Sequence, residues 1–278
     1  MRPGIAAVIA LVLSTVVSGQ QPRQPGTRTP TPRTTPAPRT PARPAPAAPA
    51  REAEVPFRVG EALTYDVSWS QFITAGTATT RVVEKKPSSG STAYAVVADG
   101  RPVPLVARFY PVYYKMESLL DSFSILSLGT SQYSEERDRK RQSTTRFDRK
   151  ARRAYYDAPA ESVKLDFQVP ANVQDGLATL YAVRGHTFKS GERFTIPVAD
   201  DGSLYSVEFD TRGPERVRVP MGDVEAWNLR LTILDDKRQP AATNSSVWVS
   251  TDARRLPVKL QSDLPVGSFV LALRDAKP

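Results

Sequence analysis

Apolar and polar residues alternate with a period of two along most of the chain after residue 57. In residues 62–69 the larger apolar side chains stand at every second position, namely Leu63, Tyr65, Val67 and Trp69. This period is typical of a β-strand with one buried face. Further runs of this kind cover residues 77–84, 94–98, 113–120, 131–139, 143–148, 153–157, 164–169, 193–198, 204–211, 215–219, 224–234, 246–250, 258–262 and 268–273. Many short strands predict an all-β, mostly antiparallel fold, either a large half-barrel or a flattened barrel or sandwich.

Turn signals separate these runs. Ala75-Gly76 is expected to bend the chain, and residues 87–90 (Pro-Ser-Ser-Gly) are expected to form a turn. Residues 200–202 (Asp-Asp-Gly) join two alternating runs, which is the usual signal of a tight hairpin. A calcium loop is the alternative for residues 200–202, but the spaced acidic pattern that ends in Glu is missing.

One segment has helical instead of alternating spacing. Val173, Leu177, Leu180 and Tyr181 lie three or four residues apart. Asn172 is expected to cap the N-terminus of a helix that spans residues 172–184, and Gly185 is expected to end it. We expect this one helix to pack against the sheet, with a gating lid as the alternative.

The N-terminus is typical of an exported protein. An apolar run of about 13 residues follows Arg2 and ends in Val17-Ser18-Gly19. The run is shorter than the roughly 20 residues that span a bilayer, so residues 1–19 are predicted to be a cleaved signal peptide, with a retained anchor as the alternative. Residues 20–54 are dense in Pro, Thr, Ala and Arg, which predicts a disordered tether. Residues 55–278 are then expected to form a single β-rich domain.

The net charge of +9 does not indicate nucleic-acid binding. Residues 1–54 carry seven arginines and two glutamates, so more than half of the excess charge lies outside the predicted domain. An exported chain also has little access to nucleic acid. A basic tether instead suits anionic lipid head groups, acidic envelope polymers or peptidoglycan. No transmembrane span is expected after signal cleavage.

The inventory of catalytic residues is small. There is no cysteine, which excludes disulfides, thiolate metal sites, a cysteine nucleophile and a lipid-modified cysteine. His186 is the only histidine, and neither a G-x-S-x-G nor an S-x-x-K motif is present. A zinc site would need a second histidine or cysteines. We therefore predict no catalytic residues, no metal and no cofactor, and we interpret His186 as a surface-loop residue.

Two sets of residues are candidates for ligand binding. Residues 137–153 carry nine basic side chains, which could hold an anionic head group or glycan, or could form the outer face of a hairpin with Phe147 inward. Aromatic side chains could line an apolar pocket or fill the core. The candidates taken from these two sets are Arg139, Arg141, Arg146, Trp69, Tyr113, Trp227 and Trp248.

Several pieces of sequence, in order, resemble the bacterial family known as domain of unknown function 3108. They are F-x-x-G-E-x-L-x-Y-x-V-x-W from Phe57 to Trp69, then Ala75-Gly76, Phe147-Asp148, D-x-L-x-x-L-Y-x-x-R from Asp175 to Arg184, V-P-M-G from Val219 to Gly222, W-V-S-x-D-x-R-R-L-P-V-K from Trp248 to Lys259, and Gly267-Ser268. The resemblance implies export and a β-rich fold without an activity. The stretch from Trp248 to Lys259 also resembles a hairpin of lipoprotein-carrier proteins, which are half-barrels around an acyl-chain cavity.

The leading prediction is an exported, non-catalytic protein of the bacterial periplasm or cell envelope. It is expected to bind an amphiphilic or hydrophobic ligand, such as a lipid, an acyl chain or a lipoprotein, in the concavity of a curved sheet. A structural or assembly module that docks on an envelope protein or peptidoglycan is the second hypothesis. An unrecognised hydrolase is the third.

Overall fold

A computed structural model describes residues 51–69, 73–88, 90–264 and 267–278. The predicted signal peptide and residues 20–50 of the predicted tether lie outside the described residues. The ordered contacts of the domain already include Glu52 and Ala53, because the Ala53 amide donates to the Ser122 carbonyl at 3.0 Å and the Ser122 hydroxyl donates to Glu52 at 3.0 Å.

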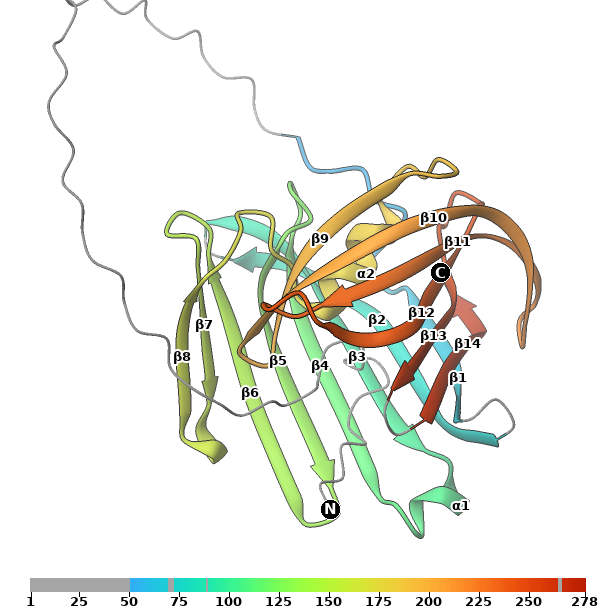
Figure 1. The fold of residues 1–278 in the computed structure, drawn as a ribbon, viewed down its shortest axis with the longest axis horizontal. Coiled ribbons are helices and arrows are strands. Elements are labelled where there is room, and N and C mark those ends of the chain that lie inside the picture. Colours follow the sequence, from blue (N-terminus) through green and yellow to red (C-terminus); the bar gives the residue numbers. More distant parts are fainter. Residues whose placement is uncertain (1–50, 70–72, 89, 265–266) are drawn as a thin grey trace, which may run out of the picture. The chain divides into compact units, whose positions relative to one another are not determined.

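The described chain forms one sheet of fourteen strands, all paired antiparallel (Figure 1). The strands are β1 (Ala62–Trp69), β2 (Ile73–Ser88), β3 (Ser91–Pro102), β4 (Val112–Asp121), β5 (Ser127–Glu136), β6 (Arg139–Asp148), β7 (Arg153–Ala158), β8 (Val163–Gln168), β9 (Arg193–Asp200), β10 (Ser203–Val219), β11 (Gly222–Leu234), β12 (Pro240–Ser250), β13 (Pro257–Leu264) and β14 (Gly267–Lys277). The helices are α1 (Pro104–Ala107), the 3-10 turn η1 (Pro159–Glu161) and α2 (Gly176–Arg184).

The strand order is that of two meanders joined at their middle. β1 to β8 follow one another in one direction, β14 back to β9 follow in the other, and β1 pairs with β14 between them. Trp69 lies opposite Phe269 and Ala62 opposite Lys277 in that central pair. β8 and β9 are therefore the two edges, and the sheet is not closed. The predicted all-β antiparallel fold is confirmed, with one open sheet in place of a two-sheet sandwich.

Helix α2 connects the two edges of the sheet. It begins four residues later than predicted, and Asp175, not Asn172, is its N-cap: the Asp175 carboxylate accepts from the Ala178 amide at 2.8 Å. The preceding residues cannot be helical because Gln174 pairs with β9, where it bonds to the backbone of Pro197 and Ala199. Tertiary pairing therefore shortens the predicted helix. A second α-helix, the single turn α1, was not expected.

Ala75-Gly76, where a bend was expected, is not a strand end: both residues lie inside β2, and the register with β1 shifts there, between Gly76 and Thr74. Gly76 faces Pro102 on β3, and a Cβ atom at Gly76 would lie 2.6 Å from the Arg101 carbonyl oxygen. This glycine thus permits a close approach of two strands. The hairpin at residues 200–202 is confirmed: Asp201 and Gly202 have φ of 46° and 74° between β9 and β10, as in a type I′ turn.

The core lies on both sides of α2. Leu177, Ala178 and Tyr181 pack with buried residues of β2, β3 and β4, such as Val96 and Met116. Val183 packs instead into the cluster formed by β9 to β12. Figure 1 shows α2 between these two parts of the curved sheet. One helix therefore fills the space that the curvature leaves.

Candidate functional site

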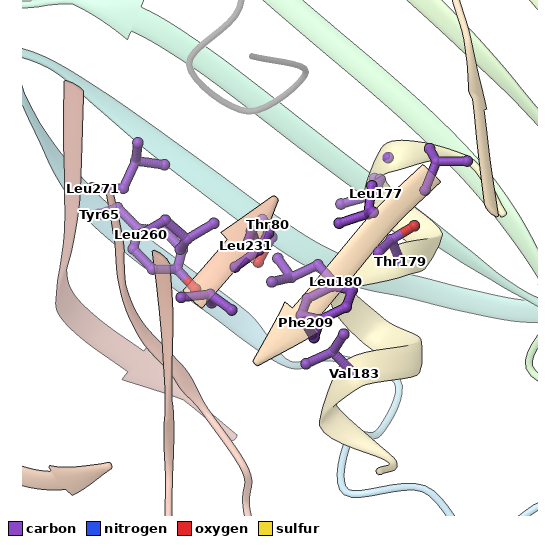
Figure 2. Close-up of a pocket in the computed structure, with 14 residues that line it drawn as sticks. Tyr65, Thr80, Leu177, Thr179, Leu180, Val183, Phe209, Leu231, Leu260 and Leu271 are labelled. Atoms are coloured by element: carbon purple, nitrogen blue, oxygen red, sulfur yellow. The ribbon is translucent and has the colours of Figure 1, made fainter. Parts of the chain in front are cut away.

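An apolar cavity lies between α2 and the concave side of the sheet (Figure 2). Its volume is about 80 Å³. Residues of α2 face strands from both meanders across it. The lining residues are Tyr65, Thr80, Gly176, Leu177, Thr179, Leu180, Val183, Val198, Val207, Phe209, Leu231, Val247, Leu260 and Leu271. Most of this lining is aliphatic, so the cavity suits an apolar group.

A buried ion pair holds the C-terminal end of α2. Arg184 is fully buried, and its guanidinium donates to both carboxylate oxygens of Glu61, at 2.6 and 2.9 Å. Its remaining donors reach the backbone carbonyls of Pro56, Arg254 and Arg255 at 3.0 to 3.3 Å. One side chain thus joins the N-terminal segment, α2 and the β12–β13 connection.

A buried carboxyl holds the other end of α2. The Ser118 and Ser127 hydroxyls, on β4 and β5, donate to the same oxygen of Asp175 at 2.6 and 2.5 Å. Burial raises the pKa of the Asp175 carboxyl above its ordinary value, and the hydrogen bonds from Ser118 and Ser127 act in the opposite direction. Next to it, the Gln174 amide bonds to the backbone of Ile125 and Ser127. Both ends of the helix are therefore fixed by buried polar contacts.

Three hydroxyl groups near the cavity are buried without a hydrogen-bond partner among the described residues. They belong to Tyr65 and Thr80, which line the cavity, and to Tyr181. Burial raises the pKa of both tyrosines, that of Tyr181 to about 12. Thr80 lies near enough to lower both pKa values against that effect. The three hydroxyls therefore lie close together and form a small polar cluster at one side of an apolar cavity.

The aromatic residues predicted from the sequence do not line this cavity. Trp69 is 42% exposed at the end of β1 and stacks on Phe269 with ring centroids 6.2 Å apart. Tyr113 lies against Tyr133 on β4 and β5, and Trp227 packs on Phe188. The indole of Trp248 donates to Glu215 at 2.5 Å. The structure does not bring the four residues together, and their role in binding stays a prediction.

The predicted basic residues lie along β6. Arg139, Arg141 and Arg146 are exposed; Arg141 pairs with Glu161 at 3.1 Å, and Arg146 lies over the Tyr155 ring at 4.5 Å. The hairpin arrangement is confirmed, with Phe147 buried and a turn after β6. Arg149 differs from the others because it donates to the carbonyls of Ala171 and Val173.

Candidate catalytic chemistry is sparse in the part of the chain that the structure describes. His186 is partly buried, lies 3.2 Å from a Glu192 oxygen and stacks on Phe194 at 4.2 Å. No group of three His, Asp or Glu side chains that could hold a metal ion occurs in the described ranges. The same ranges contain no helix long and apolar enough to cross a bilayer.

The fold and the cavity define a class of β-barrel-like proteins with an open antiparallel sheet around an internal helix. The chain belongs to the family of proteins of unknown function DUF3108, which it matches over residues 64–274. The suspected family is thereby confirmed. Comparison with curated proteins gives no match.

Comparison with solved structures finds similar chains at low sequence identity. A β-barrel-like protein of the domain of unknown function DUF1849 from Brucella abortus aligns with a TM-score of 0.53 and 10% identity, over 79% of this chain and 97% of that chain. A protein from Parabacteroides distasonis described as a candidate lipoprotein aligns with a TM-score of 0.36 and 7% identity, over 82% and 100% of the two chains. Only the first score is high enough to support a common fold.

Sequence reasoning missed the residues that organise the site. Glu61 and Arg184 are both present in the motif pieces, yet no chemistry was assigned to them. Arg184 follows Leu177, Leu180 and Tyr181 at helical spacing, so it lies on the apolar face of the helix. An arginine on the apolar face of a helix is expected to be buried, and a buried arginine needs an acidic partner. This pattern could have indicated the Glu61–Arg184 ion pair.

Proposed function

We propose that this protein binds, without catalysis, the apolar part of an amphiphilic molecule in the cavity between α2 and the sheet. The observation that carries the proposal is an apolar cavity bordered on one side by the buried hydroxyls of Tyr65 and Thr80. An aliphatic chain would fill the apolar lining, and the two hydroxyls would bond to a polar group of the ligand. Export to the bacterial periplasm or envelope, expected from residues 1–19, would supply lipids, acyl chains or lipoproteins as ligands.

The size of the cavity limits the part of the ligand that enters it. Its volume of about 80 Å³ is near half of the roughly 150 Å³ of an apolar cavity that admits benzene. A whole acyl chain does not fit, so a short end of a chain is the expected occupant of this state. A longer ligand would require the two parts of the sheet to move apart.

The electrostatics favour an uncharged polar group. Arg184 is the buried cation near the hydroxyls, and Glu61 neutralises it while three carbonyls take its other donors. A carboxylate in the cavity would therefore lose hydration without gaining a free cationic partner. We expect a long-chain alcohol or ester to bind more tightly than the corresponding fatty acid.

The test is binding of dodecan-1-ol and dodecanoic acid to the full chain by native mass spectrometry. The variant V207I/V247I adds two methyl groups to the lining and is expected to weaken dodecanol binding at least tenfold. V258I adds one methyl group at a buried valine outside the cavity and is expected to leave binding unchanged. Equal binding by all three proteins would place the ligand elsewhere, and no binding of either probe would refute the proposal.

A second candidate function is docking on another envelope component through a strand edge. β8 is an edge strand of the described sheet, and its Leu165 is exposed. An unpaired edge can add a strand from a partner protein. Sedimentation with purified peptidoglycan and crosslinking from position 165 in an envelope fraction would test it. This function would be favoured if protein purified from an envelope without detergent carried no amphiphile.

A further inference from the structure

The connection between β3 and β4 carries two large apolar side chains, which are the most exposed of their kind among the described residues. Leu105 is 67% exposed and Phe109 is 75% exposed. Helix α1, which carries Leu105, contains no buried residue. Backbone bonds order the connection instead: Val103 donates to Ala75, and Phe109 and Tyr110 donate to Val106. These apolar side chains are therefore held outward by an ordered turn that gains nothing for the core.

Basic side chains surround this turn. Arg108 lies within it, and the β5–β6 turn lies beside it, because the Arg137 amide donates to the Pro111 carbonyl at 3.1 Å. The Arg137 guanidinium lies 5.4 Å from the centre of the Tyr110 ring. In Figure 1, α1 and the β5–β6 turn lie at the same end of the sheet. We use the name apolar tip for this surface, which consists of Leu105, Phe109, Arg108, Arg137 and Arg139.

The charges of the apolar tip are available to a partner. Arg108, Arg137 and Arg139 are exposed, and no carboxylate within the described residues forms an ion pair with them. Of the acids nearby, Glu135 pairs with Lys140, and Glu136 accepts a hydrogen bond from Tyr114. Asp138 is the exposed acid of the turn. The tip therefore presents free positive charge next to exposed apolar surface.

We propose that the apolar tip docks on an anionic lipid bilayer surface. Apolar side chains that enter the head-group region, together with arginines that contact acidic lipid, supply the two signals that stable peripheral binding requires. Charge complementarity selects a bilayer over an uncharged apolar partner. The proposal does not rest on the cavity: vesicle binding and dodecanol binding are measured separately, and either can fail alone.

The test is flotation of the full chain with vesicles of phosphatidylglycerol and phosphatidylcholine in equal parts, at low salt. L105S/F109S is expected to weaken binding by about 10- to 100-fold, because the two apolar side chains that would move from water into the bilayer are gone. R137Q/R139Q is expected to weaken vesicle binding by about fivefold per arginine. Salt at 1 M is expected to remove the same electrostatic contribution from the parent. Residues 1–50 are the same in every variant, so differences between variants report on the tip.

Matched controls change similar residues elsewhere on the surface. V59S/M221S removes two exposed apolar side chains, and R193Q/R216Q removes two exposed arginines of β9 and β10. Both are expected to bind as the parent does. Thermal unfolding of each variant will show whether the fold is kept, which we expect because α1 has no buried residue.

A local probe makes the result independent of residues 1–50. F109W is expected to show quenching by brominated phosphatidylglycerol in excess of the parent's, whereas V59W is expected to show none in excess. Absence of quenching in F109W, or equal flotation of L105S/F109S and the parent, would overturn the proposal. Equal binding to pure phosphatidylcholine would overturn its charge component, and binding to an acidic protein but not to vesicles would assign the tip to a protein partner.

Discussion

Glu61→Gln is the substitution whose consequence is best defined by the structure. It keeps the shape of the side chain but removes the only carboxylate that the Arg184 guanidinium touches among the described residues. The other acceptors of Arg184 are the neutral carbonyls of Pro56, Arg254 and Arg255. The substitution therefore leaves a buried positive charge with neutral partners. A buried ion pair that loses one partner costs about 3–5 kcal/mol.

This loss is large but measurable. A domain of this size has an unfolding free energy of about 5–15 kcal/mol, so most E61Q molecules should remain folded. Each kcal/mol lowers the melting temperature by roughly 2–4 °C for domains of 150–250 residues, which gives a decrease of about 6–20 °C. Urea unfolding followed by tryptophan fluorescence, together with calorimetry, measures both quantities.

The matched control is Glu84→Gln on β2. Glu84 pairs with Lys86 at 2.8 Å, and both side chains are about half exposed. Exposed pairs contribute about 0–1 kcal/mol, so E84Q should unfold almost as the parent does. If E61Q also stayed within about 1 kcal/mol of the parent, the ion pair would not hold the three segments together and the reasoning would be refuted.

Three further predictions concern the glycine contact, the buried carboxyl and the cavity. Gly76→Ala should lower the unfolding free energy by about 1–3 kcal/mol in urea, because its Cβ would lie 2.6 Å from a backbone oxygen; Gly100→Ala, whose nearest atom is 3.8 Å away, should cost less than half of that. Asp175→Asn should remove a pH dependence of stability: the folded pKa of Asp175 is raised, so its contribution is complete below the unfolded value near 3.8 and is lost as pH rises through the folded pKa. The parent should therefore lose stability relative to D175N as pH rises above about 4 in urea titrations, and a relative gain would contradict the pKa direction. V207I/V247I should raise the unfolding free energy by up to about 1.6 kcal/mol, since each buried methyl group contributes about 0.8 kcal/mol when it fills free space. A lower unfolding free energy would mean that the cavity cannot accept the added methyl groups.

The strands could be predicted from the sequence because their signal is local. The alternation of Leu63, Tyr65 and Val67 depends only on one face being buried, and the Asp-Gly hairpin depends only on turn geometry. The N-cap of α2 could not be predicted in this way. Gln174 is extended because it pairs with β9, so a contact distant in sequence decides where the helix begins.

The site could not be predicted because it is assembled from many strands and one helix. Aromatic residues were expected to line a pocket, yet the strand register places Trp69 at a strand end and Trp248 beside Glu215. The cavity is lined mainly by aliphatic residues, which sequence alone cannot separate from those of the filled core. Of the residues that line the cavity, only Tyr65 belongs to the first alternating run, residues 62–69.

The contacts at the two ends of α2 bear on how a ligand would reach the cavity. A lid must leave its place at modest cost, but outward movement of α2 would break the Arg184–Glu61 pair and the hydrogen bonds of Asp175 to Ser118 and Ser127. Each of these losses costs on the order of 1–5 kcal/mol. β8 and β9 are not strand partners, but side chains join the two edges: Tyr156 donates to Asp201 at 2.6 Å, and Phe167 packs in one cluster with Ala199. We therefore expect α2 to act as a packing helix and not as a lid.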